Sequence, residues 1–165
     1  MTLDGSSAAT ASKVTLDKHF VRKPAPVTYA FDVRVDQTGP AQAVEFVSLR
    51  TADFAVTLAF HIGIADGSFI FAEFAKGTDP PADYSASTLA LVDAAWHRFE
   101  VQITYEAAVQ VSVRVDGRVV IAPRAIKVVP AAAPTTEMVF AVGVNDIESV
   151  TGNLSYLIDN ATLSN

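Results

Sequence analysis

Residues 96–121, which read WHRFEVQITYEAAVQVSVRVDGRVVI, limit the folds open to this chain more than any other segment. Apolar and polar residues alternate from 96 to 105 and again from 109 to 115. Successive side chains of an extended strand point to opposite faces, so each run predicts a strand with one apolar and one polar face. Asp116-Gly117 follows the second run and precedes a third apolar run. In that context Asp-Gly predicts a type I′ hairpin turn, in which both central residues take positive φ.

The rest of the chain shows the same two-residue period. A second Asp-Gly pair, at residues 66–67, predicts another hairpin, whose return strand at residues 69–74 is apolar on both faces. That strand should be central and covered twice, or should offer one face to a ligand. No segment has the i, i+3, i+4, i+7 apolar spacing of an amphipathic helix. The other expected strands are residues 14–16, 27–35, 44–49, 54–62, 137–144 and 154–163.

Short strands separated by turn residues predict an all-β fold, an antiparallel sandwich of two sheets. We expect the longest loop at residues 77–84 and another at 145–153. An irregular, Ala-rich passage around residues 127–129 is interrupted by Pro123, Pro130 and Pro134. The side chains expected to face the core of the sandwich include Tyr29, Phe31, Val33, Val35, Trp96 and Phe99.

The 165 residues suffice for one domain, which we place at residues 14–165 after a polar, flexible leader at residues 1–13. Cysteine is absent, which excludes a disulfide framework, a zinc-thiolate site and a cysteine nucleophile. The N-terminus lacks the charged-then-apolar order of a signal peptide, so either the protein is not exported or its export signal has been removed. We favour the second alternative and expect an extracellular or cell-surface protein.

Charge and hydropathy restrict the partners. The chain has 12 Lys and Arg against 18 Asp and Glu, a net charge of -6, which argues against nucleic acid and anionic membrane surfaces. Membrane insertion is not expected, since no apolar run approaches the roughly 20 residues of a membrane-spanning helix. Half of the residues (50%) are hydrophobic and 18% are charged, so much of the chain must be buried between sheets or against a partner.

Three segments resemble the concanavalin A-like lectin/glucanase jelly-roll superfamily, particularly its laminin-G-like branch and related carbohydrate-binding modules. WHRFEV at residues 96–101 is similar to the strand opening of that superfamily, and VSVRVDG at residues 111–117 is similar to its hairpin. YLIDNATL at residues 156–163 is similar to its closing strand. The resemblance implies a jelly roll over nearly the whole chain. Its members include lectins, adhesion domains, glycoside hydrolases and polysaccharide lyases, so the fold alone does not choose a function.

The polar sheet face is the first candidate for a binding site. It offers carboxylate, amide and guanidinium groups that suit sugar hydroxyls, although a solvated outer face with cross-strand ion pairs is the alternative. Tyr84, in the expected Pro-rich loop, is the candidate aromatic platform, whereas Trp96 is expected in the core. The other ligand-binding candidates are Asp32, Arg34, Arg98, Glu100, Gln102 and Arg114, with Gln110 and Ser112 on the same face.

Calcium is the metal that the resemblance implies, held by carboxylates and carbonyls of loops. No other cofactor is required. The candidate ligands are Asp79, Asp83, Asn145, Asp146 and Asp159.

No catalytic motif is present. The resemblance would lead us to look for an E-x-D-x-x-E string or an Arg-rich strand with Q-I-H, and both are missing; the nearest acidic pair is Asp146 and Glu148. The histidines His19, His61 and His97 lack ligand spacing, and His97 shares the face of Phe99, so we interpret them as structural.

We therefore predict a non-catalytic bacterial binding module that takes a glycan. The first alternative is a protein–protein adhesion or assembly module, including a homo-oligomer, that uses the apolar strand at residues 69–74. The second alternative is a polysaccharide hydrolase or lyase.

Overall fold

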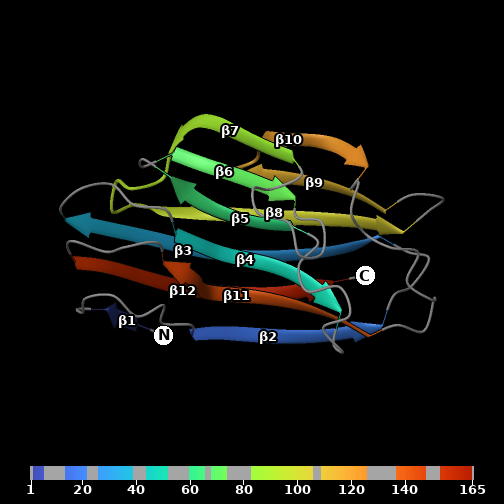
Figure 1. The fold of residues 1–165 in the computed structure, drawn as a ribbon, viewed down its shortest axis with the longest axis horizontal. Helices are drawn as coiled ribbons and strands as arrows, with labels where there is room; N and C mark the ends of the chain where they lie inside the picture. Colours follow the sequence, from blue (N-terminus) through green and yellow to red (C-terminus); the bar gives the residue numbers. More distant parts are fainter. Residues whose placement is uncertain are drawn as a thin grey trace.

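The computed structural model describes residues 2–5, 14–21, 26–38, 44–51, 60–65, 68–73, 83–105, 109–125, 137–147 and 153–164. Within these segments the chain forms two six-stranded antiparallel sheets (Figure 1). Sheet A has the strand order β1 (Thr2–Gly5), β12 (Asn153–Ser164), β3 (Val27–Thr38), β8 (Trp96–Tyr105), β9 (Val109–Val115) and β10 (Arg118–Ala125). Sheet B has the order β2 (Val14–Val21), β11 (Glu137–Ile147), β4 (Val44–Thr51), β5 (Phe60–Ala65), β6 (Ser68–Glu73) and β7 (Asp83–Ala90).

The two sheets pack face to face through aromatic side chains. Tyr29 of sheet A lies 4.1 Å from Phe140 of sheet B between ring centroids, and Phe99 lies 6.3 Å from Phe69. These contacts belong to one cluster of buried apolar residues. The predicted apolar faces of β3, β8 and β9 are confirmed. The inward residues of these strands are 4% exposed or less: Tyr29, Phe31, Val33, Val35, Phe99, Val101, Ile103, Val111, Val113 and Val115.

The predicted turn at residues 116–117 is confirmed. Asp116 has φ 51° and Gly117 has φ 75°, and the Asp116 N–H donates to the Arg98 carbonyl at 2.9 Å. The second hairpin is confirmed by its strands, because Ala65 of β5 lies opposite Ser68 of β6; residues 66–67 themselves lie outside the described residues.

Replacing Gly117 with alanine is expected to lower the free energy of unfolding by about 1 to 2 kcal/mol, because an L side chain is strained at positive φ. A Cβ at this position would meet nothing within 4 Å, so steric crowding adds no cost. Urea unfolding measures the change. Gly117→Asn is the control, since asparagine tolerates this conformation and should lose less. An alanine variant as stable as the parent would contradict the assigned turn.

Several strands are longer than the sequence predicted. β2 continues to Val21 because it pairs with β11 along its whole length, and β11 continues to Ile147, into the expected loop at residues 145–153. Asp83 and Tyr84, also expected in a loop, open β7 opposite β6. Thr2–Gly5, expected in a flexible leader, pairs with β12. In each case pairing with a neighbouring strand places in a sheet residues whose own alternation did not predict a strand.

Pro123 lies inside β10, in the segment that was expected to be irregular. β10 is an edge strand of sheet A, and its register against β9 shifts between Ile121 and Arg124. Proline has no N–H to donate, so a sheet tolerates it in an edge strand or where the register shifts. Residues 126–136 lie outside the described residues. In the described segments no helix is long and apolar enough to cross a membrane.

Candidate functional site

The outer face of sheet A carries most of the predicted binding residues. Asp32 of β3 lies opposite Arg98 of β8, Glu100 of β8 lies opposite Arg114 of β9, and Gln102 of β8 lies opposite Ser112 of β9. Cross-strand partners point to the same side, and their inward neighbours are buried, so these polar side chains share the solvent face.

A hollow of about 280 Å³ opens in this face. Its lining combines two hydroxyls, a carboxylate, an amide and a guanidinium, contributed by Thr28, Glu100, Gln102, Ser112 and Arg114. In the described part of the chain, none of these five side chains has a hydrogen bond or an ion pair, although Glu100 and Arg114 lie directly across from each other. The hollow therefore presents polar groups that are free to form hydrogen bonds with a ligand.

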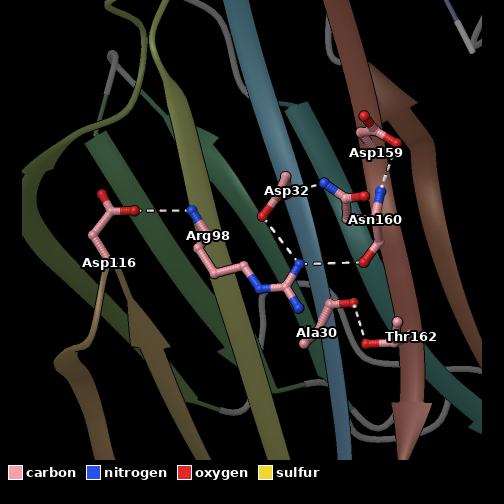
Figure 2. A network of polar contacts seen from close by, with 7 residues as sticks. All are labelled: Ala30, Asp32, Arg98, Asp116, Asp159, Asn160 and Thr162. Carbon is pink, nitrogen blue, oxygen red and sulfur yellow. Dashed lines mark hydrogen bonds and ion pairs between the residues drawn. The ribbon is translucent and has the colours of Figure 1, made fainter.

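The polar residues next to the hollow are, by contrast, bonded to one another (Figure 2). Arg98 Nη1 donates to Asp32 Oδ1 at 3.0 Å and to the Asn160 carbonyl at 3.2 Å. Asn160 Nδ2 donates to Asp32 Oδ2 at 2.6 Å. Arg98 thus reaches from β8 across β3 to β12, and the network holds three strands of sheet A in register.

A β-bulge in β12 places Asn160 in this network. The register against β3 shifts between Asp159 and Thr162, and Asn160 takes φ 50°, a conformation that asparagine tolerates better than most residues. The Asn160 N–H donates to Asp159 Oδ1 at 2.7 Å. The Asp-Asn pair of the closing strand, one of the three segments that carried the resemblance, therefore has a structural role here.

Trp96 lies on the outer face, not in the core. Its side chain is 48% exposed, and it lies opposite Arg34, another of the predicted binding residues. The expectation of a core tryptophan was wrong because it relied on residue type. The alternation of side chains along β8 could have predicted this exposure, because Trp96 is an even number of residues from Arg98 and Glu100 and so lies on the same face. At about 3.3 Å per residue, Trp96 lies about 13 Å along the strand from Glu100.

His97, the next residue, points inward and is buried, as expected from its parity with Phe99. Its Nδ1 contacts Asp116 Oδ2 at 2.8 Å and its Nε2 contacts Asp93 Oδ1 at 3.1 Å. Burial lowers the pKa of His97, but the hydrogen bonds to Asp116 and Asp93 outweigh it and hold the pKa above the ordinary histidine value. The backbone hydrogen bond from Ala95 and the side-chain bond from His97 lower the pKa of Asp93.

The predicted calcium ligands that the structure describes lie on three different strands. Asp83 is in β7, whereas Asn145 and Asp146 are in β11, with β4, β5 and β6 between the two strands; at about 4.8 Å per strand this is about 19 Å. Asp159 is in the other sheet, and Asp79 lies outside the described residues, as does Glu148. Among the residues that the structure describes, no group of three or more His, Cys, Asp or Glu is arranged to hold a metal ion.

Tyr84, the predicted platform, is the second residue of β7 and pairs with Ala72 of β6. It belongs to sheet B, so the strand that carries it is not part of the face that forms the hollow. Among the residues whose side chains are described, Trp96 is an exposed aromatic residue on the same face as the predicted polar residues.

The strand order, the antiparallel pairing and the aromatic core between the sheets define an antiparallel two-sheet jelly-roll sandwich, the fold that the resemblance of the three segments implied. Solved structures of other proteins have the same fold. Alginate lyase A1-II′, of polysaccharide lyase family 7, superposes with a TM-score of 0.66 at 12% identity over 99% of this chain and 78% of its own. An endo-β-1,4-glucuronan lyase from Trichoderma reesei superposes with a TM-score of 0.61 at 10% identity, covering 92% of this chain and 75% of its own.

Sheep galectin-11 in complex with glycerol superposes with a TM-score of 0.56 at 12% identity over 90% of this chain and 96% of its own. No protein-family model and no curated protein matches the sequence. At these identities the structural likeness establishes the fold, and lyases share that fold with a galectin.

Proposed function

We propose that this chain is a non-catalytic carbohydrate-binding module that takes a glycan on the outer face of sheet A. The observation that carries the proposal is the hollow formed by Thr28, Glu100, Gln102, Ser112 and Arg114, whose polar groups are free of partners in the described part of the chain. Sugars present closely spaced hydroxyls, which both donate and accept. A carboxylate, an amide, a guanidinium and two hydroxyls in one hollow complement such a ligand.

Trp96 supplies the apolar component of the proposed site. A pyranose ring has an apolar face, and an exposed aromatic ring can pack against it while polar side chains bond the hydroxyls. Trp96 lies about 13 Å along β8 from Glu100, which is further than one sugar ring extends. The spacing supports an oligosaccharide that spans several sugar units. Two of the structural neighbours are named as polysaccharide-type lyases, which is consistent with a carbohydrate ligand.

The charge arrangement supports binding rather than hydrolysis. A glycosidase needs two carboxylates placed about one glycosidic bond. Among the described residues that line the hollow, Glu100 is the one carboxylate, and the nearby carboxylate of Asp32 is already engaged by Arg98 and Asn160. His97 faces the interior of the sandwich, so its ring lies on the opposite side of sheet A from the hollow.

Binding of the purified chain to an array of neutral and acidic oligosaccharides tests the proposal, with one arm in calcium and one in chelator. We expect Trp96→Ala and Arg114→Ala each to weaken binding about tenfold, because each removes a contact worth about 1 to 1.5 kcal/mol. Glu137→Gln, on β11 of sheet B, is the control and should leave binding unchanged. Binding that both outer-face variants retain in full would place the site elsewhere.

Two further readouts separate the alternatives. A lyase would release unsaturated products, visible by ultraviolet absorbance when the chain is incubated with polyuronates, and we expect none. An array without signal in either buffer, together with dimerisation that depends on protein concentration, would instead favour the adhesion or assembly module.

A further inference from the structure

The two contacts of His97 define its protonation state. Asp93 and Asp116 accept from the ring at 3.1 Å and 2.8 Å, and the His97 side chain is 11% exposed. An ionised carboxylate accepts hydrogen bonds and has none to donate. Both ring nitrogens must therefore carry a proton for both contacts to exist, and a neutral imidazole has only one N–H. The observed geometry is that of a charged imidazolium.

Charged groups approach His97 from two turns in the described part of the chain. Asp93 belongs to the turn before β8, and Asp116 belongs to the turn between β9 and β10, where the charge of Arg118 also acts on it. From β3 the residue opposite His97 is Val33, which is buried and apolar. The proton on His97 is therefore held by these two carboxylates.

Loss of that proton must break one of the two contacts, and the geometry selects the contact with Asp93. Asp116 is fixed by its other oxygen, which accepts from the Arg98 N–H at 2.8 Å, and by its own N–H, which donates to the Arg98 carbonyl at 2.9 Å. The Asp93 side chain is 47% exposed and its contact with His97 is the longer one. Neutral His97 would keep its N–H toward Asp116, and Asp93 would turn to water.

The turn that Asp93 anchors leads directly into Trp96. Asp93 Oδ1 also accepts from the Ala95 N–H at 2.8 Å. Between them Ala94 has φ 59°, a strained conformation for alanine, and its N–H donates to the Val35 carbonyl at 3.2 Å. The contact between Asp93 and His97 helps to hold this strained turn, and the turn determines where the backbone enters β8 at Trp96.

We propose that the hydrogen bond from protonated His97 to Asp93, called the tie below, holds Trp96 in position. Loss of the ring proton then weakens carbohydrate binding on the outer face of sheet A. The regulatory part of this proposal rests on the function proposed above. The positioning part concerns the chain without ligand and is tested separately.

Trp96 is the one tryptophan in the sequence, so its fluorescence reports on this turn alone. Without ligand, we expect its emission to change in a single one-proton transition, with a midpoint above the ordinary histidine pKa of about 6.5 because the hydrogen bonds to Asp116 and Asp93 raise the pKa of His97. His97→Gln should give a flat profile. A flat profile in the parent chain, or the same transition in His97→Gln, overturns the tie.

Asp93→Asn keeps the tie testable if His97→Gln does not fold. It removes one of the two charges that hold the proton, and it changes a side chain that is 47% exposed. The transition should move to lower pH, and an unmoved midpoint overturns the tie. The control is His19→Gln, which alters the exposed pair between His19 and Glu137 in sheet B and should leave the transition unchanged.

The same oligosaccharide array, probed at one pH below and one pH above the midpoint of that transition, tests the regulation. Binding by the parent chain should weaken roughly three- to tenfold at the higher pH, and binding by His97→Gln should not change with pH. Equal binding at both pH values by the parent chain overturns the regulation and leaves the proposed function intact. No binding at either pH refutes the proposed function and the regulation together, while the fluorescence titration still decides whether the tie exists.

Discussion

Replacing Phe99 with alanine is expected to lower the free energy of unfolding by about 3 to 5 kcal/mol. Phe99 is fully buried, stacks on Phe31 of β3 with ring centroids 5.3 Å apart, and lies 6.3 Å from Phe69 of sheet B. The truncation removes apolar surface from both sheets at once and leaves a cavity that the paired strands cannot close. Urea or thermal unfolding of the parent and the variant measures the loss.

Two variants check that the loss comes from the core. Phe99→Leu keeps much of the buried area and should cost roughly half as much. Val119→Ala, at a position 55% exposed on β10, should change stability by less than about 0.5 kcal/mol. If Phe99→Ala proved as mild as Val119→Ala, the two sheets would not be packed through this ring.

Replacing Asp32 with alanine is expected to lower the free energy of unfolding by about 1 to 3 kcal/mol. The carboxylate of Asp32 accepts from Arg98 Nη1 at 3.0 Å and from Asn160 Nδ2 at 2.6 Å, so one truncation removes an acceptor from two donors (Figure 2). Arg98 is 38% exposed and Asp32 is 23% exposed, which allows water to replace part of what is lost.

Asp36→Ala is the matched control for Asp32→Ala. Asp36 lies on the same strand and, by parity, on the same face, but its side chain is exposed and has no partner among the described residues. Its replacement should stay within about 0.5 kcal/mol of the parent. Asn160→Gly should fall between the two, because glycine keeps the positive φ of the bulge while the amide donor is lost. Equal losses for Asp32→Ala and Asp36→Ala would argue against the network.

Local features of the fold were predictable from the sequence. The alternation in β3, β8 and β9 identified the buried face of each strand, and Asp116-Gly117 identified the turn, including its positive φ angles. Both features depend on the backbone conformation of a few consecutive residues, so no knowledge of the neighbouring strands was needed. Where neighbours did matter, as at the ends of β2 and β11, the predicted strands were too short.

The candidate site was predictable only in part. The polar residues of β3, β8 and β9 were identified as one face, and Glu100, Gln102 and Arg114 do line a hollow together. The contact between Asp32 and Arg98 joins residues 66 positions apart, and that between Asp32 and Asn160 joins residues 128 apart. No local pattern specifies such pairs, because they depend on the order of the strands in the sheet.

Alternation of apolar and polar side chains is a property of consecutive residues, and it sufficed to predict an antiparallel sandwich and the face on which each strand is buried. Strand order and register arise only when distant segments pair. These decided that Trp96 lies opposite Arg34, that His97 lies between two carboxylates, and that a hollow with free polar groups opens over β3, β8 and β9. The physical reason is that hydrogen bonding between strands, unlike side-chain alternation, joins residues without regard to their separation along the chain.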